Sequence, residues 1–408
     1  MASNGDQRVC IMGGCGHVGL PLGLSLASTG LDVELFDVDQ AAVDLVNSGI
    51  MPFMDEGADE LLREVVGSGL TATSERESLT RSDVVVVSLG TPVDEHLNPE
   101  VHDLLAILEE LIRGPMRDGQ LLVLRSTVYP GTSQLVQDRL DDSGKRIDLV
   151  FCPERIAQGS SLKEIWELPQ IIASFNDRAF ERAASLFGAV APEVVRAEPL
   201  EAELAKLFTN AWRYIEFATA NQFYMIAESY GLDFYRIYDV LTHNYKRAAG
   251  YPTPGFAAGP CLFKDTMQLA AFHSNAFFLG HAAMLVNEGL PDFLVRQLKA
   301  RVTLRRWRVG VLGMAFKGDS DDPRESLSYK LRKLLTAEGA EVLCTDPYID
   351  DPSFLSLDEV LASAQTIIVA APHARYRTLD LEGRDIVDPW GVAATTRSLG
   401  RKRVAHGD

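Results

Sequence analysis

The chain has 408 residues, 46% of them hydrophobic and 24% charged, with a formal net charge of −18. This length suggests two or three domains of ordinary globular composition. The acidity argues against nucleic acid as a partner, because phosphate backbones require a basic face, but a small anionic ligand needs only a local positive cluster. No apolar stretch is long enough to span a membrane, and the first residues, MASNGDQ, do not form a secretory signal. We therefore expect a cytoplasmic protein.

The cysteines predict neither a disulfide framework nor a metal site. They are odd in number, widely spaced and free of CxxC pairs: Cys10, Cys15, Cys152, Cys261 and Cys344. In a reducing compartment each is a free thiol, so one of them is available as a nucleophile.

The first part of the chain alternates short apolar runs with helical patterns. Strands are predicted at Val9–Met12, Asp32–Phe36, Asp83–Ser88 and Gln120–Leu124, and a helix at Val18–Ser28. This alternation is typical of a parallel sheet with helices on both faces. We assign residues 1–195 to this domain.

A long helix is predicted next, from Leu200 to Tyr230, because this stretch lacks Pro and Gly and Gly231 provides the stop. A helix of that length bridges domains, forms a dimer interface or lies buried in a core. We assign residues 196–297 to a central helical domain and expect a homodimer or a higher homo-oligomer.

The third part repeats the first. The predicted elements are a strand at Arg308–Leu312, a helix at Ser328–Ala337 and a strand at Glu341–Thr345. Gly30 precedes Asp37 by seven residues, and Gly339 precedes Asp346 by the same seven. The predicted fold class is α/β, with two doubly wound Rossmann-like domains joined by a helical domain with one long central helix. The third domain covers residues 298–408, and its tail beyond Arg397 is expected to be loose.

A dinucleotide motif opens the first domain. Gly14-Cys-Gly16-His-Val-Gly19 follows a strand and starts a helix, and Asp37 ends the next strand. Gly14 is expected to allow the tight turn, Gly16 the approach of a pyrophosphate to the helix N-terminus, and Gly19 the packing of helix on strand. Asp37 would bind both ribose hydroxyls and repel a 2′-phosphate, which favours NAD over NADP. The alternative is a glycine-rich turn without a ligand.

The second copy lacks this glycine pattern and reads Gly313-Met-Ala-Phe-Lys317-Gly318. A lysine at this turn suits an anionic group other than a dinucleotide pyrophosphate, although it could also be a solvated surface residue. The two similar domains would then hold two different ligands.

A nucleophile motif lies between the two domains. Gly259-Pro-Cys261-Leu-Phe-Lys-Asp265 follows a loop rich in Pro and Gly. Pro260 fits the first turn of a helix, so Cys261 would lie near a helix N-terminus, where the dipole favours a thiolate. Asp265 is one turn further on the same face, an arrangement that suits covalent catalysis. The alternative is a buried structural cysteine.

Lys206 and Asn210 have i, i+4 spacing on the predicted long helix. Both can point into one cleft and donate hydrogen bonds to a developing alkoxide. The alternative is a solvated helix face that carries a lysine.

Together these residues resemble the UDP-glucose/GDP-mannose dehydrogenase family over nearly the whole chain. The matching blocks, in family order, are Gly14–Gly19, Gly90-Thr-Pro92, Arg125-Ser-Thr-Val-Tyr-Pro-Gly131, Cys152-Pro-Glu154-Arg155, Lys206 with Asn210, Gly259–Asp265, Leu312–Lys317 and Asp321-Asp-Pro-Arg324-Glu-Ser.

The resemblance implies a four-electron oxidation of the C6 alcohol of a nucleotide sugar to a uronic acid by two NAD, in polysaccharide biosynthesis. Asp265, with Lys206 and a water, would assist removal of the hydroxyl proton. Cys261 would form a thiohemiacetal whose oxyanion Lys206 and Asn210 stabilise, and then a thioester. Glu154 would orient or activate the hydrolytic water, which Thr127 positions.

The resemblance also implies binding residues. Cofactor contacts are expected from Gly14, Gly16, His17, Val18, Gly19, Asp37, Thr91, Pro92, Thr127 and Lys264. Substrate contacts are expected from Glu154, Arg155, Lys206, Asn210, Arg247, Phe256, Gly259, Lys317 and Arg324. Arg247 would act in its own subunit or in the neighbouring one.

The family often has Gly-Gly-x-Cys where this chain has Ala258-Gly-Pro-Cys261, which stiffens the approach to the nucleophile. The Arg125-Ser-Thr-Val-Tyr-Pro block and the short spacing from Arg247 to Cys261 favour the UDP-N-acetyl-hexosamine branch. UDP-glucose and GDP-mannose remain alternative substrates, with UDP favoured by resemblance. A two-electron hydroxyacid dehydrogenase would not use the thiol or the third domain, and a non-catalytic NAD-binding scaffold would not need Cys261.

Overall fold

The structure, a computed structural model, describes residues 7–91, 101–257 and 259–393. The chain divides into two compact units, residues 1–209 and 210–408, and we treat each by itself. The three-domain division at residues 195 and 297 stays a prediction. Within the described ranges, no helix combines the length and the apolar character needed to cross a membrane.

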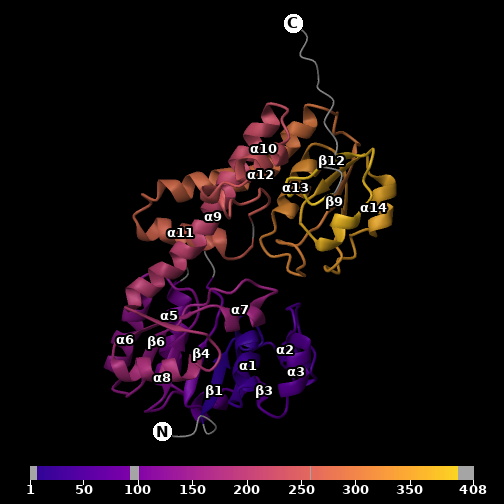
Figure 1. The fold of residues 1–408 in the computed structure, drawn as a ribbon. Coiled ribbons are helices and arrows are strands. Elements are labelled where there is room, and N and C mark those ends of the chain that lie inside the picture. Colours follow the sequence, from indigo (N-terminus) through magenta and orange to yellow (C-terminus); the bar gives the residue numbers. More distant parts are fainter. Residues whose placement is uncertain (1–6, 92–100, 258, 394–408) are drawn as a thin grey trace. The chain divides into compact units, whose positions relative to one another are not determined.

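The N-terminal unit is built on an eight-stranded sheet of order β3-β2-β1-β4-β5-β6-β7-β8 (Figure 1). The strands are β1 Arg8–Met12, β2 Asp32–Phe36, β3 Leu70–Thr73, β4 Val84–Val87, β5 Leu121–Leu124, β6 Asp148–Phe151, β7 Gln170–Ser174 and β8 Val194–Ala197. All neighbours are parallel except β6 and β7, which pair antiparallel. The expected parallel sheet is therefore present but contains one antiparallel junction.

Helices cover both faces of this sheet. They are α1 Gly19–Ser28, α2 Gln40–Asn47, α3 Ala58–Val65, α4 Glu77–Arg81, α5 Val101–Arg113, α6 Thr132–Ser143, α7 Ser161–Glu167 and α8 Asp177–Phe187. Alternate strand residues enter two separate cores: Val9 and Ile11 pack in one with α1, and Cys10 packs in the other with α5. This two-sided burial explains why the strands are continuous apolar runs and confirms the doubly wound architecture.

The C-terminal unit contains a smaller parallel sheet of order β10-β9-β11-β12. Its elements after the central helices are β9 Arg308–Leu312, α13 Leu327–Ala337, β10 Glu341–Thr345, α14 Leu357–Ser363, β11 Thr366–Val369, η3 Ala374–Thr378 and β12 Asp385–Val387. This order matches β2-β1-β4-β5 of the first sheet, so the internal repeat seen in the sequence is a repeat of topology.

Helix α9 spans Pro199–Ser229, 31 residues, within one residue of the expected ends. It is followed by α10 Phe234–Thr242, the short 3-10 helix η2 Lys246–Ala248, α11 Leu262–Phe272 and α12 Phe278–Lys299. The expected long central helix is thus present.

Candidate active site

The glycine-rich turn after β1 is shaped by close packing. The N–H groups of Gly13 and Gly14 both donate to the carbonyl of Phe36, at 3.0 and 3.1 Å. A Cβ on Gly14 would lie 2.7 Å from the Leu35 Cβ, and one on Gly19 would lie 2.3 Å from the Gly13 carbonyl oxygen. The left-handed residue of the turn is Gly13, with φ +73°, which the motif does not include. Gly14 is therefore required for packing, and Gly13 makes the turn that we expected of Gly14.

The N-terminus of α1 fits a pyrophosphate. No side chain caps this helix at Val18, so its first N–H groups can face an anionic ligand. A Cβ on Gly16 would meet only the Gly13 carbonyl oxygen, at 3.5 Å. Protein packing therefore does not demand glycine at position 16, and a need for glycine there would come from the ligand.

Asp37 and His17 flank this turn. The Asp37 carboxylate accepts hydrogen bonds from the N–H groups of Cys15, at 3.0 Å, and Asp39, at 3.1 Å, which fixes it at the end of β2. The His17 ring lies 4.0 Å from the ring of Phe53, and the Gln158 amide nitrogen is 3.1 Å from His17 Nδ1. The turn, the helix and the acidic residue thus come together as the sequence predicts.

Alanine at Gly16 and at Gly19 should have opposite consequences. Gly19→Ala is expected to destabilise the unit by roughly 1–3 kcal/mol, since the added methyl overlaps backbone. Gly16→Ala should keep the unfolding temperature and weaken NAD binding about tenfold or more by blocking the phosphates. Thermal unfolding and NADH fluorescence titration measure the two effects, and equal losses of stability would contradict this assignment.

The loops after β4 and β5 meet beside the turn. The Thr91 hydroxyl donates to the Thr127 carbonyl at 2.7 Å, and the Leu89 N–H donates to the Ser126 hydroxyl at 2.8 Å. Ligands of doubly wound sheets bind at such carboxyl ends, where the strand order reverses. Thr91 and Thr127 are thus placed where a cofactor contact is expected, whereas Pro92 lies outside the described residues.

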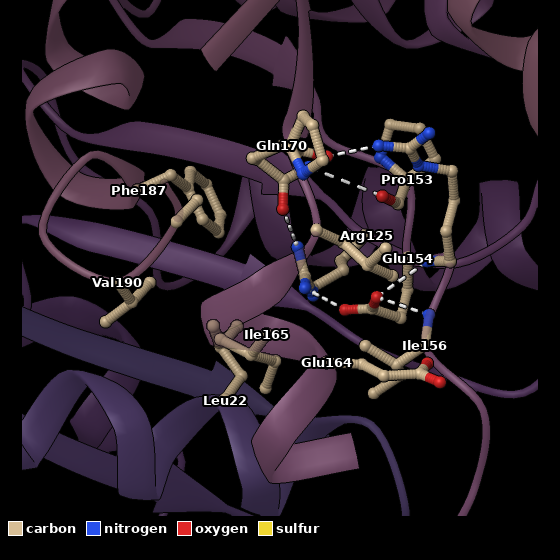
Figure 2. A pocket seen from close by; sticks show the side chains of 14 residues that line it. Leu22, Arg125, Pro153, Glu154, Ile156, Glu164, Ile165, Gln170, Phe187 and Val190 are labelled. Atoms are coloured by element: carbon tan, nitrogen blue, oxygen red, sulfur yellow. Dashed lines mark hydrogen bonds and ion pairs between the residues drawn. The ribbon is translucent and has the colours of Figure 1, made fainter. Parts of the chain in front are cut away.

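A buried ion pair lies next to these loops, in a pocket between β5, β6 and the helices α7 and α8. Figure 2 shows Arg125 directed at Glu154 and Gln170. The Arg125 side chain is 2% exposed; it forms an ion pair with Glu154 and donates to Gln170 Oε1 at 3.0 Å. The other oxygen of Glu154 accepts from the N–H groups of Arg155 and Ile156 at 2.6 and 2.8 Å.

Both carboxylate oxygens of Glu154 are therefore engaged, and its orientation is set by Arg125. We assigned no role to Arg125 from the sequence, although it stands in a matching block. A lone arginine directly after an apolar strand, followed by a glutamate after the next strand, was the signal that could have identified the pair.

The C-terminal unit carries the thiol. Cys261 is exposed and is the N-cap residue of α11, as expected for a nucleophile at a helix N-terminus. Pro260 precedes the N-cap, so the expectation that it occupies the first helical turn is wrong. The residue ahead of it is Gly259 with φ +97°, and the chain enters the helix only after the proline.

Asp265 lies one turn below the thiol and is fully buried. Its Oδ2 accepts a hydrogen bond of 2.5 Å from the Asn210 side-chain amide, and its Oδ1 is 3.5 Å from Lys264 Nζ. Among the described residues, Oδ1 accepts no hydrogen bond. The structure thus joins two residues that were separate in the sequence, and it places Lys264 against the carboxylate. Lys206 lies one turn before Asn210 on α9.

Two asparagines hold the loop before the thiol. Asn221 accepts from the Gly255 N–H at 2.8 Å and donates to the Gly255 carbonyl at 2.9 Å, and it also donates to Asn287 Oδ1 at 2.9 Å. Phe256 is 3% exposed and packs in the core of this unit, so its expected substrate contact has no open ring face to support it.

The second glycine-rich turn repeats the first in its hydrogen bonds. Asp346 Oδ2 accepts from the N–H groups of Met314 and Ala315 at 2.6 and 3.0 Å, as Asp37 does from Cys15. Here, however, buried His373 also reaches Asp346, with its Nε2 3.1 Å from Oδ2. Asp346 is thereby occupied within the protein, which is consistent with a ligand other than a dinucleotide. Half-buried Lys317 lies in the same loop.

Arg324 lies further along the same loop as Lys317. The next residue, Glu325, accepts a hydrogen bond of 3.3 Å at its carbonyl from the Gly259 N–H. Arg247 is exposed on η2, and the described residues provide no contact between it and the thiol. Arg155 donates to the Pro169 carbonyl. The expected substrate contacts of these residues stay predictions.

Models of three domains of one family match the chain. The NAD binding domain of the UDP-glucose/GDP-mannose dehydrogenase family matches residues 7–190, the central domain 200–288 and the UDP binding domain 310–394. The chain belongs to this family, as the sequence motifs indicated.

Individual relatives cover almost the full length. UDP-N-acetyl-D-mannosamine dehydrogenases of Methanocaldococcus jannaschii and Pyrococcus horikoshii are each 29% identical, over 92% and 97% of this chain and 88% and 99% of theirs. The structure of UDP-D-ManNAc dehydrogenase from Pyrococcus horikoshii matches with a TM-score of 0.87 at 27% identity, covering 98% of this chain and 97% of that one. A UDP-glucose dehydrogenase from Pyrobaculum islandicum matches with a TM-score of 0.89 at 26% identity, covering 97% of each.

The protein is therefore an NAD-dependent nucleotide-sugar dehydrogenase, an oxidoreductase that acts on a CH–OH group. The resemblance in motif to the N-acetyl-hexosamine branch is confirmed by these relatives.

Proposed function

We propose that this enzyme oxidises the C6 alcohol of a UDP-N-acetylhexosamine to the carboxylate, through a thiohemiacetal and a thioester on Cys261. The exposed thiol at the N-cap of α11, one turn above buried Asp265, is the observation that carries the proposal. A dehydrogenase that stopped at the aldehyde would have no use for this nucleophile.

NAD, when bound, supplies the hydride acceptor for each of the two oxidations. In the first, the alcohol loses a hydride and its hydroxyl proton and becomes the aldehyde. Lys206 and the Asn210–Asp265 pair are proposed to guide that proton away through a water and to stabilise negative charge on the oxygen. The reaction requires the hydride acceptor and the thiol to act on the same carbon.

Cys261 then adds to the aldehyde carbon as a thiolate, and the oxygen takes up a proton to give the thiohemiacetal. This bond keeps the aldehyde on the enzyme between the two oxidations. Loss of a second hydride and of the hydroxyl proton leaves a thioester, and attack by water breaks the C–S bond, releases the carboxylate and restores the thiol.

Glu154 is proposed to orient the hydrolytic water. Arg125 and two backbone N–H groups hold its carboxylate, so it can present an oxygen lone pair in a fixed direction without reorganising. Thr127, half-buried after β5, is proposed to position the same water.

The substrate is proposed to be UDP-N-acetyl-mannosamine or a close UDP-N-acetylhexosamine, supported by the names of the nearly full-length relatives. UDP-glucose is the second candidate, since an enzyme of that name from Haloferax volcanii is 28% identical over 90% of this chain and 92% of its own. Lys317 and Arg324, in the loop after β9, are proposed to contact the nucleotide sugar, together with Arg247.

Counting NADH separates this reaction from its alternatives. With UDP-N-acetyl-mannosamine we expect two NADH for each sugar consumed, and a lower kcat/KM with UDP-glucose and GDP-mannose. One NADH would indicate a two-electron dehydrogenase, and none with any sugar would indicate a non-catalytic NAD-binding protein. Either result overturns the proposal.

A homodimer through α9 is also proposed. Large apolar side chains lie exposed along one stripe of this helix and at the residue directly after its end: Phe208, Trp212, Phe223 and Ile226, then Tyr230. Their spacing of three, four or eleven residues places them on one face. A stripe of this kind marks an interaction surface, and light scattering of the purified protein decides between one copy and two.

A further inference from the structure

The loop after β9 reaches the segment that carries the thiol. The Gly259 N–H donates to the Glu325 carbonyl at 3.3 Å, and a Cβ on Gly259 would lie 2.5 Å from the ring of Phe316. Gly259, two residues before Cys261, is therefore held between Phe316 and Glu325, the first and last residues of the segment 316–325. Arg324 precedes the residue that accepts this hydrogen bond.

Asp322 holds the Arg324 guanidinium in one orientation. Its Oδ1 accepts from Arg324 Nε at 2.9 Å, and its Oδ2 accepts from Nη2 at 2.6 Å. The Arg324 backbone N–H also donates to Oδ1, at 2.9 Å. The Asp322 side chain is 3% exposed, so its carboxylate is a fixed support, while the Arg324 side chain is 54% exposed. A bidentate pair defines the plane of the guanidinium as well as its distance.

The Nη1 group of this guanidinium is not used by Asp322. Within the described part of the chain, Arg324 Nη1 donates to no protein acceptor. The pKa of Arg324 is raised, mainly by its hydrogen bonds to Asp322, while partial burial lowers it by less. The charges of Asp322 and of the Cys261 thiolate raise this pKa further. Electrostatic coupling is reciprocal, so a cation that gains from the thiolate also favours it.

Other groups around the thiol act in different directions. Asp265, one turn along α11, is an acidic residue and opposes a nearby thiolate. Lys264 Nζ lies 3.5 Å from Asp265 Oδ1 and offsets the charge of that carboxylate. Asn210 is neutral, and Glu325 is exposed beside Arg324. No side chain caps α11, so the positive end of its dipole adds to the effect of the arginine.

We propose that Asp322 is a positioning residue that holds Arg324 toward Cys261, so that the guanidinium stabilises the thiolate from which the covalent step begins. The only bond that changes is S–H, whose proton passes to water. This role adds to the proposed contact of Arg324 with substrate, and it rests on Cys261 being the nucleophile.

Alkylation of the full-length protein by iodoacetamide tests the proposal without turnover. The rate at the Cys261 peptide is followed by mass spectrometry as a function of pH. Arg324→Met should move the midpoint of the rate profile upward by about one pH unit, which is a tenfold loss of rate on the acidic limb. Arg324→Lys should restore part of that shift, since it returns the charge without the bidentate fork.

Asp322→Asn separates positioning from simple charge. Removing a negative charge near the thiol would by itself lower the midpoint, whereas releasing Arg324 from its support should raise it. Glu325→Gln, which removes an exposed charge one residue from Arg324, should leave the midpoint in place. If Asp322→Asn does not fold, Asp322→Glu keeps the charge, displaces the carboxylate and should also raise the midpoint.

An unchanged midpoint in Arg324→Met, or a lowered one in Asp322→Asn, would overturn the inference. These outcomes are independent of the proposed reaction, because alkylation requires no substrate. If the enzyme turned over normally without the Cys261 thiol, the proposed function would fail while the measured coupling of Arg324 to the thiol would stand.

Discussion

Cys261→Ser is expected to lower kcat by about 10³-fold or more. The serine hydroxyl is a far weaker nucleophile than a thiolate and is not ionised near neutral pH, so the aldehyde is no longer held for the second oxidation. With UDP-N-acetyl-mannosamine and excess NAD, the variant should give at most a short burst of NADH. The wild-type enzyme should show a mass increase on the Cys261 peptide under the same conditions.

Cys344→Ala is the matched control. This thiol is buried in β10, where no substrate can reach it, so its loss should leave kcat within about twofold and cost only some stability. Normal turnover with two NADH per sugar in Cys261→Ser would remove the thiol from the mechanism and leave the dehydrogenase assignment in place.

Arg125→Met is expected to destabilise the protein by about 2–4 kcal/mol, because it removes a buried guanidinium and leaves the half-buried Glu154 carboxylate with only its two backbone N–H donors. Gln170 also loses the donor to its side-chain oxygen. We expect a lower unfolding midpoint in urea and, in the folded fraction, accumulation of the thioester because the water-orienting carboxylate has lost its support. Chemical denaturation and mass spectrometry of the quenched enzyme measure the two effects.

Arg146→Met provides the comparison. Arg146 pairs with Asp118 on the surface, with the two side chains 84% and 50% exposed. Such a pair is screened by solvent, so its loss should leave the unfolding midpoint nearly unchanged. Equal destabilisation by the two substitutions would show that the burial of Arg125 does not matter, and thioester hydrolysis at the normal rate in Arg125→Met would contradict the role given to Glu154.

The strands that were predicted were placed well, because the strands of a sheet covered on both faces are continuous apolar runs bounded by polar turns; no bounds were predicted for β3, β6, β7, β8, β11 and β12. Asp32–Phe36, Arg308–Leu312 and Glu341–Thr345 match their predicted ends. The ends of α9 were equally clear, since a Pro at the start and a Gly after the end punctuate the helix. The helix at Cys261 was less clear, because Pro260 fits two adjacent positions near a helix start.

Residues that act through other residues were missed. Arg125 holds Glu154 and Asn221 holds Gly255, each about 30 residues away along the chain. Asp322 holds Arg324, two residues away in the same loop. The first two pairs are brought together by neighbouring strands or by helix packing, and the third by the path of one loop, and a linear pattern carries no record of either. Phe256 is a different case: it packs in the core of its unit, and its expected substrate contact stays a prediction.

By itself, the sequence determined the two doubly wound sheets, the long helix that lies between them in the chain, and the dinucleotide turn, and it singled out Cys261 as the proposed nucleophile, because local periodicity, glycine spacing and residue chemistry are properties of short segments. Only the tertiary structure decided which groups orient the reactive ones: Asn210 on Asp265, Arg125 on Glu154 and Asp322 on Arg324. Orientation depends on burial and on contacts between separate elements or within a folded loop, and these exist only after the chain has folded.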